Sequence, residues 1–324
     1  MYIFDAHSDL LTDTAGKLGE GRHGNFARDH LPRLRQAGIK GIISVVWITP
    51  EYTDDPLARF KDLVPLTMRE VEESGDVLRV VHTIGEIEQA EKDGITFAIL
   101  GVEGASGFAN GLDTIRDMYG MGFRHIGLTW NEKNDFATGV RSPEVGRGLT
   151  RLGREAAELM EELGMIIDVS HLNEKSFWDL VDATKGVIIA SHSNCRTLCP
   201  NDRNITDQQI RAIAGRGGVI GMNAWGDFVR SDRKPNLDDF IDHIDHLVNL
   251  VGIESVMFGF DFCDYFGKDP TTTEDKELPV TEGLGKCEDV PDLIRAMEKR
   301  GYGQDAIEKI AHRNVKRMLA DVLG

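Results

Sequence analysis

The sequence predicts an α/β fold, a (β/α)8 TIM barrel that forms a single domain over residues 1–324 and ends in additional C-terminal helices. Eight short apolar runs rich in β-branched residues recur along the chain. Near-continuous apolar runs of this kind are typical of parallel strands that are buried on both faces. Helical patterns lie between most of the runs, and strand–helix alternation repeated eight times is the signature of this barrel.

The predicted strands begin with the first residues of the chain. In order, they cover residues 2–9, 39–48, 96–103, 123–130, 165–171, 186–193, 218–225 and 255–262. The connection over residues 49–95 is long and rich in helical patterns.

Apolar residues at helical spacing predict the helices of the second half of the chain. These helices cover residues 147–164, 173–185, 206–215 and 236–251, with two final helices near 290–300 and 303–322. Thr206 is the expected N-cap of the third helix. The segment 264–289 is rich in glycine, threonine and acidic residues, so we expect an active-site loop or lid there. No repeat and no linker divides the chain, which favours one domain.

The composition disfavours several classes of partner. The formal net charge is −17, and both nucleic acid and an anionic membrane surface would repel such a chain. No run approaches the roughly 20 apolar residues that a membrane span needs. The first residues carry no signal-peptide pattern, so we expect a cytoplasmic protein.

The most informative pattern is His7-Ser8-Asp9, at the end of the first predicted strand. Residues i and i+2 of a strand point to the same face, so His7 and Asp9 can direct an imidazole nitrogen and a carboxylate oxygen at one metal ion. Barrels build their active sites at the carboxyl ends of their strands. The pattern therefore gains weight if further ligands follow other strands.

Four further candidates end other predicted strands, namely Glu103, His171, His192 and Asp261. Oxygen and imidazole ligands suit Zn²⁺ or a similar divalent ion, and one carboxylate can bridge two ions about 3.5–4 Å apart. Each residue alone has a structural alternative: a packed or capping histidine, an ion pair of Glu103 with Arg124, or a loop cap for Asp261. The joint pattern at five strand ends favours a metal centre.

Two other groups of candidate ligands are weaker. His243 and His246 have the i, i+3 spacing of a helical metal pair, but they lie off the apolar stripe, so we expect a solvated or edge position. Cys195 and Cys199 could suggest a zinc knuckle, yet no second Cys or His pair follows at finger spacing. Reduced thiols near a pocket wall are the better interpretation.

The ordered set of motifs resembles the membrane dipeptidase (renal dipeptidase) family of zinc peptidases, within the amidohydrolase-like barrels. The similarity spans nearly the whole chain. The motifs are Asp5-Ala6-His7-Ser8-Asp9, Gly101-Val102-Glu103-Gly104, Gly127-Leu128-Thr129-Trp130-Asn131-x-x-Asn134, Asp168-Val169-Ser170-His171, Ser191-His192-Ser193, Asp202-Arg203-Asn204 and Gly259-Phe260-Asp261-Phe262. No single motif is specific, but the ordered set is.

The resemblance implies a metallo-dipeptidase with a dinuclear site of two Zn²⁺ ions. His7 and Asp9 would hold one ion, His171 and His192 the other, and Glu103 would bridge them. A hydroxide between the ions would be the nucleophile.

The same resemblance implies roles around the metal site. Asp261 would move a proton from the nucleophile to the leaving amine. Arg203 would pair with the C-terminal carboxylate of a dipeptide; its alternative is an ion pair with Asp202 or Asp207. Trp130 and Asn131, in the fourth strand-end motif, are further expected substrate-binding residues. Trp225, at the end of the seventh predicted strand, is expected to line the pocket, with core packing as its alternative. L-D dipeptides are among the expected substrates, and a homodimer is the expected assembly.

Two positions depart from the family pattern. Trp130 stands where the family often has an oxyanion-stabilising histidine, and an indole N–H donates one hydrogen bond but carries no charge. The loop Asp261-Phe262-Cys263-Asp264 replaces Asp-Phe-Asp-Gly. The first departure motivates a second hypothesis, an amidohydrolase acting on another amide, a lactone or a β-lactam-like ring. A third hypothesis, an inactive binding protein on this fold, predicts lost ligands, and none of the proposed ones is missing.

Overall fold

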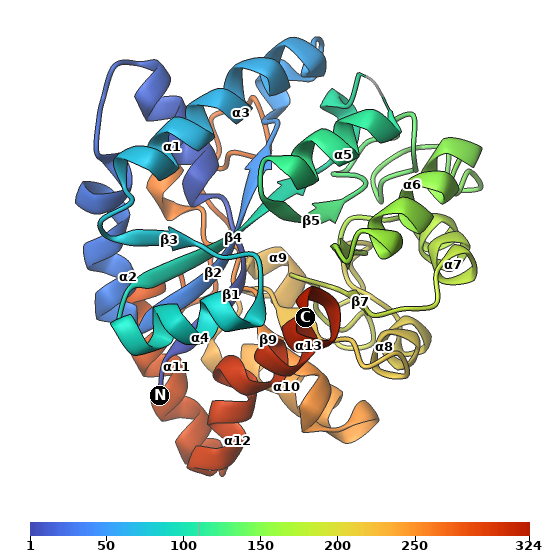
Figure 1. Ribbon diagram of the computed structural model, residues 1–324. Coiled ribbons are helices and arrows are strands. Elements are labelled where there is room, and N and C mark those ends of the chain that lie inside the picture. The colour runs from blue at the N-terminus through green and yellow to red at the C-terminus, as the bar shows by residue number, and fades with distance from the viewer. Residues whose placement is uncertain (110) are drawn as a thin grey trace.

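Eight parallel strands form a nearly closed barrel in the computed structural model, which describes residues 1–109 and 111–324 (Figure 1). The strand order around the barrel is β7-β6-β5-β4-β2-β1-β9-β8. A parallel bridge between Ala190 and Ile220 joins the two ends of this series. The strands are β1 (Ile3–Ser8), β2 (Ile39–Trp47), β4 (Thr96–Glu103), β5 (Phe123–Gly127), β6 (Ile166–Asp168), β7 (Ile188–Ile189), β8 (Ile220–Met222) and β9 (Val256–Phe258). The predicted barrel is confirmed.

The later strands are shorter than predicted because the chain leaves the sheet toward the site. The carboxylate of Asp168, the last residue of β6, accepts the backbone N–H groups of Ser170 at 2.9 Å and Ser191 at 3.0 Å. These side-chain bonds replace the ladder hydrogen bonds that a longer strand would make. The predicted stretches 165–171 and 186–193 therefore end as ordered loops.

A ninth strand, β3 (Leu78–Val80), was not predicted. It lies in the helix-rich connection and pairs with residues Thr96 to Ala98 at the start of β4. On that edge, β5 begins to pair with β4 only at Leu100. The first residues of β4 are therefore not paired with β5 on this edge, and β3 pairs with them instead.

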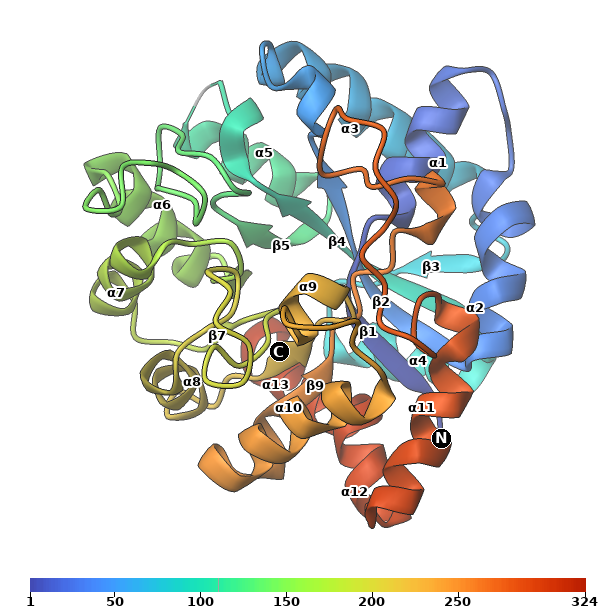
Figure 2. The same cartoon turned by 180° about the vertical axis from the view of Figure 1, so that it is seen from behind.

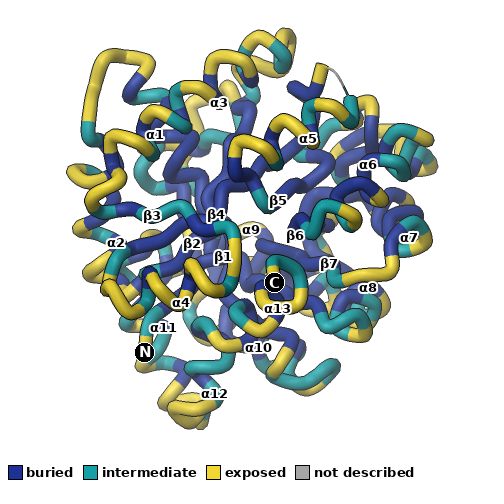
Figure 3. The backbone as a smooth tube through the Cα atoms, viewed as in Figure 1, coloured by how far each residue is buried: buried dark blue, intermediate teal, exposed yellow. Residues whose placement is uncertain are grey.

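Helices surround the barrel and bury their inner faces, whereas their outer faces are exposed (Figure 3). They are α1 (Leu10–Gly19), α2 (Leu31–Ala37), α3 (Pro56–Glu73), α4 (Ile84–Asp93), α5 (Leu112–Gly120), α6 (Arg151–Glu162), α7 (Glu174–Ala183), α8 (Asp207–Ala214), α9 (Gly226–Val229), α10 (Leu237–Val251), α11 (Val290–Arg300), α12 (Gln304–Glu308) and α13 (Asn314–Leu323). Thr206 caps α8 as expected, since its hydroxyl accepts the N–H of Gln209. The last predicted helix is interrupted by a π-helical turn over Lys309–Arg313. None of the helices that the structure describes is long and apolar enough to cross a membrane.

The first and the last strand of the chain are neighbours in the barrel. Strand β1 pairs with β9, and the side chain of Asp5 accepts the N–H of Phe260 at 2.9 Å across a sequence separation of 255 residues. Seen from behind, the segment that follows β9 crosses the barrel between α9 and α3 (Figure 2). This segment contains Thr271, which lines the pocket described below.

Candidate metal centre and pocket

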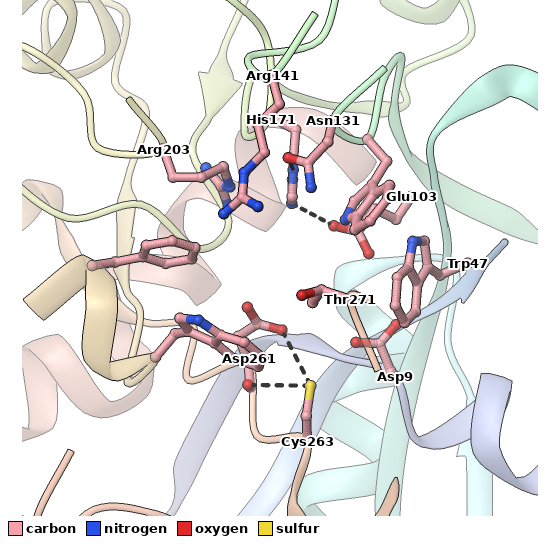
Figure 4. Close-up of a pocket in the computed structure, with 13 residues that line it drawn as sticks. Asp9, Trp47, Glu103, Asn131, Arg141, His171, Arg203, Asp261, Cys263 and Thr271 are labelled. Carbon is pink, nitrogen blue, oxygen red and sulfur yellow. Dashed lines mark hydrogen bonds and ion pairs between the residues drawn. The ribbon is translucent and has the colours of Figure 1, made fainter. Parts of the chain in front are cut away.

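The carboxyl ends of the strands surround a pocket (Figure 4). Its lining residues are Asp9, Trp47, Glu103, Trp130, Asn131, Arg141, His171, Arg203, Trp225, Phe228, Asp261, Cys263 and Thr271. All of the site residues that the sequence predicts belong to this set except His7 and His192. Those two histidines are buried beside it, because their rings contact Glu103 and stack at 3.6 Å between centroids.

Glu103 joins two groups of potential ligands. Its Oε1 lies 2.8 Å from Nε2 of His171 and 3.4 Å from Nε2 of His192. Its Oε2 lies 3.5 Å from Nε2 of His7. The other neighbours of His7 Nε2 are Oδ2 of Asp9 and Oδ1 of Asp261, each at 3.8 Å. The Glu103 carboxylate therefore faces a pair of imidazoles through Oε1 and, through Oε2, the cluster of His7 with Asp9 and Asp261.

The polar atoms of these clusters fit bound cations. Both ring nitrogens of His7 and Oδ1 of Asp9 are buried without a hydrogen-bond partner. Unpaired buried polar atoms are rare in native proteins, and an ion is one of the few explanations for a cluster of them. The described residues include the groups Glu103–His171–His192 and His7–Asp9–Asp261, whose ligand atoms lie within 4.8 Å of one another.

Neighbouring side chains direct the free ring nitrogens of His171 and His192 into the site. Nδ1 of His171 lies 3.1 Å from the amide oxygen of Asn131, which can only accept. Nδ1 of His192 lies 2.7 Å from Oγ of Ser191, whose hydroxyl donates to Asp168. Both Nδ1 atoms therefore carry the proton, and both Nε2 atoms present lone pairs. Partners of this kind fix the tautomer of metal-binding histidines.

Asp168 could form a third group with His7 and His192, but its oxygens are already used. Besides the two backbone N–H groups, it accepts the hydroxyl of Ser191 and lies 3.1 Å from Nε2 of the buried His125. These contacts lower the pKa of Asp168 despite its burial, which would raise it. We interpret Asp168 as an anchor for the His192 loop.

The electrostatics of the site reflect burial and crowded charges. Burial would lower the pKa of His7, but the carboxylates of Glu103, Asp261 and Asp9 raise it to about 10. Burial lowers the pKa of His171 to about 4, and Arg203 acts in the same direction. Burial raises the pKa of Asp261 to about 6. So many competing charges in one pocket are a mark of functional sites.

Two site residues adopt left-handed backbone conformations. The φ angle is 65° at His171 and 60° at Asp261, and these are the only non-glycine residues of the described chain with positive φ. Such conformations cost free energy for residues with a Cβ atom and concentrate at functional sites. No sequence pattern predicted these left-handed conformations.

Arg203 is buried without a counter-ion. Its side chain is 3% exposed, Nη2 donates to the carbonyl of His192 at 3.1 Å, and Nε has no partner. The alternative ion pair with Asp202 or Asp207 is absent from the described contacts; Asp207 instead binds His246. Burial lowers the pKa of Arg203 to about 10.

The other predicted lining residues surround the same space. Trp130 packs on Trp47, with ring centroids 5.3 Å apart, and Trp225 stacks with Phe228 at 6.2 Å. Trp225 is 8% exposed, so pocket lining and core packing both apply to it. The alternative partner of Glu103, Arg124, instead lies over the ring of Tyr119.

The sequence analysis missed several pocket residues. Trp47 ends β2, and this strand-end position could have identified it. Thr271 belongs to the segment 264–289, where an active-site loop was expected, and Cys263 belongs to the altered loop after Asp261, although neither residue was singled out. Arg141 lies in a long loop without a pattern that marks it.

The expectation for His243 was wrong, whereas that for His246 was right. His243 is 1% exposed, its Nδ1 accepts the N–H of Cys195, and its Nε2 lies 2.9 Å from the carbonyl of Val229. Both ring nitrogens are therefore used in packing α10. His246 lies at the edge of the helix and binds Asp207.

Comparison with known proteins shows which family the chain resembles, independently of the geometry of the site. The model of the membrane dipeptidase family, peptidase family M19, matches residues 1–323. An uncharacterised protein in the pqqA 5′ region of Klebsiella pneumoniae is 35% identical over 83% of this chain and 97% of its own. An uncharacterised dipeptidase of Schizosaccharomyces pombe is 32% identical over 97% of this chain and 71% of its own.

Solved structures share the fold. A dipeptidase AC of metallopeptidase family M19 superposes with a TM-score of 0.87 at 24% identity, covering 100% of this chain and 99% of its own. A metallopeptidase from Rhodobacter sphaeroides, bound to a phosphinate mimic of the dipeptide L-Ala-D-Ala, gives a TM-score of 0.86 at 23% identity, with 99% of each chain covered.

Proposed function

The chain belongs to the membrane dipeptidase family, peptidase family M19, and is therefore a metallo-dipeptidase; we propose that its pocket cleaves dipeptides with a free C-terminal carboxylate, L-D dipeptides included. One observation carries this proposal: a buried guanidinium without a counter-ion, that of Arg203, shares one pocket with the cluster around Glu103. A substrate with an anion at one end and a peptide bond nearby complements this arrangement.

The metal ions of this proposal are two Zn²⁺. His7 and Asp9 would hold one, His171 and His192 the other, and Glu103 would reach both. Bound there, the ions would polarise the peptide carbonyl and acidify a water, so that hydroxide is available at neutral pH. The unpaired atoms of His7 and Asp9 and the inward Nε2 atoms of His171 and His192 support this assignment.

Asp261 is the proposed proton carrier. Its Oδ2 accepts Nδ2–H of Asn223 at 3.0 Å, and its carboxylate lines the pocket beside the His7 cluster. A carboxylate in this position can take a proton from the attacking water and deliver it to the leaving amine. Its backbone is left-handed, and its side chain lines the pocket (Figure 4).

Arg203 is the proposed partner of the substrate's α-carboxylate. Its free Nε–H and its planar guanidinium can form a bidentate pair, while Phe228 lies 5.3 Å from the guanidinium carbon. Trp130, Asn131 and Trp225 would complete the walls, with Asn131 also holding the ring of His171.

A paired substrate panel tests the proposal. Purified protein with added Zn²⁺ is assayed on L-Ala-L-Ala, L-Ala-D-Ala and the C-terminal amide of each. We expect turnover of the free acids, loss of turnover with a chelator, and at least about a hundredfold lower kcat/KM on the amides, which give Arg203 no anion. No turnover of any free acid with Zn²⁺ present would refute the dipeptidase assignment of the pocket. Equal turnover of acids and amides would refute the role of Arg203.

Location in the cytoplasm and assembly as a homodimer stay predictions. Cell fractionation measures the first. Light scattering on the purified protein measures the second.

A further inference from the structure

A second guanidinium reaches the pocket beside Arg203. Arg141 lines the same pocket, and its side chain points into it next to Arg203 (Figure 4). Among the described residues, its guanidinium has no ion pair and no hydrogen bond. The α-carboxylate of one dipeptide carries a single negative charge, so it can neutralise only one of these two arginines.

The backbone holds Arg141 in place even though its side chain is exposed. Its N–H donates to the carbonyl of Asn131 at 3.0 Å, and the N–H of Val140 donates to the carbonyl of His171 at 2.8 Å. Gly139 forms an antiparallel bridge with Leu172. The loop is therefore tied to two residues of the site, so the backbone of Arg141 is held at the rim of the pocket.

Two like charges close together are unfavourable without an anion between or beside them. Arg141 and Arg203 bring two positive charges to one pocket, and neither of them has an ion pair among the described residues. A second anion on the substrate would relieve this repulsion. The side chain of the C-terminal residue branches from the same Cα as the α-carboxylate, so a carboxylate there falls beside the anion that Arg203 binds.

We propose that Arg141 is a specificity-determining residue that selects dipeptides with an acidic C-terminal residue, by binding the side-chain carboxylate while Arg203 binds the α-carboxylate. This inference rests on the proposed function of the pocket.

The test compares Ala-Asp with its neutral isostere Ala-Asn and with Ala-Ala, using the stereoisomer of the C-terminal residue that the enzyme accepts. For the zinc-loaded wild-type protein we expect kcat/KM to be about tenfold higher on Ala-Asp than on Ala-Asn, the effect of one charge-assisted hydrogen bond. Arg141→Gln should lower this ratio about tenfold. The control Arg151→Gln removes the same charge from a side chain that is 91% exposed and lies outside the pocket, and it should keep the wild-type ratio.

Other outcomes separate the competing explanations. An unchanged ratio in Arg141→Gln would overturn the proposal, and so would an equal loss on all three substrates, since both arginines would then share the α-carboxylate. If the wild-type protein hydrolyses none of the three, the proposed function fails. Calorimetry with aspartate and asparagine then decides the role of Arg141: tighter binding of aspartate that is lost in Arg141→Gln supports it, and equal binding refutes it.

Discussion

The Nε2 atoms of His171 and His192 face each other at 3.0 Å, although neither carries the proton. Both Nδ1–H groups are committed, one to Asn131 and the other to Ser191. Two lone pairs at this distance repel unless a cation lies beside them. Glu103, within 3.4 Å of each Nε2, adds a third donor atom to the same position. The arrangement of these donor atoms in the described residues is therefore that of a cation-binding site.

Ser191 should tune metal affinity without touching the metal. Ser191→Ala removes the acceptor of the His192 Nδ1–H bond and should lower zinc affinity about 10- to 100-fold, as for other partners of ligating histidines. Competition with a fluorescent chelator measures this. Ser255→Ala, at a buried serine directly before β9, is the control and should keep the wild-type affinity. Equal affinities in the two variants would contradict the tautomer argument.

Asp261→Asn separates proton transfer from metal binding. The amide keeps the shape of the side chain but cannot accept a proton at the operating pH. We expect bound metal to stay at the wild-type level while kcat falls about 10²- to 10⁴-fold, measured by elemental analysis and steady-state kinetics. Asp227→Asn, at an exposed position, is the matched control. Loss of metal would instead make Asp261 a ligand of the His7 cluster.

Arg203→Met should separate stability from activity. The wild-type protein buries this cation with one carbonyl as its hydrogen-bond partner, which is unfavourable for folding. We therefore expect the free energy of unfolding to stay constant or rise by about 1–2 kcal/mol, while KM for dipeptides rises steeply. Urea unfolding and kinetics on one preparation measure both. A clear loss of stability would show that Arg203 is structural.

Arg33 should stabilise the segment that follows β9 and crosses the barrel, and this stabilisation should weaken at acidic pH. It pairs with Glu288 through two bonds of 2.6 and 2.8 Å and with Asp264 at 2.6 Å, at the two ends of that segment. The Arg33 bonds lower the pKa of Glu288 from 4.5 to about 2. Because the folded-state pKa is depressed, the stabilisation is complete above the ordinary pKa and is lost as the pH falls from 4.5 toward 2.

Arg33→Gln should therefore flatten this pH dependence. We expect a loss of about 1–2 kcal/mol near neutral pH, partial because both side chains are partly exposed, and a smaller further loss on acidification. Thermal unfolding between pH 7 and pH 3 measures it. If the unfolding temperatures of the wild type and of Arg33→Gln fall in parallel with pH, Arg33 is not the cause of the lowered pKa of Glu288.

Much of the site was predictable because its residues end apolar strands. The positions of His7, Glu103 and Asp261 follow from strand boundaries and from the rule that barrel strands share one end. The contacts of Asp168 and the position of Arg141 in the pocket could not be predicted, since they depend on loops that meet only in the folded chain. His243 shows the same limit: its burial comes from its contacts with Cys195 and Val229, which no helical pattern contains.

The pairing of β1 with β9 has a consequence for synthesis of the chain. Asp5 anchors the turn that carries Asp261, so the first strand completes the barrel only after a partner 255 residues away has been translated. Until then, His7 and Asp9 belong to a chain whose barrel is still open. During translation, the barrel therefore cannot bring Asp261 beside His7 before the chain has been made as far as Phe260.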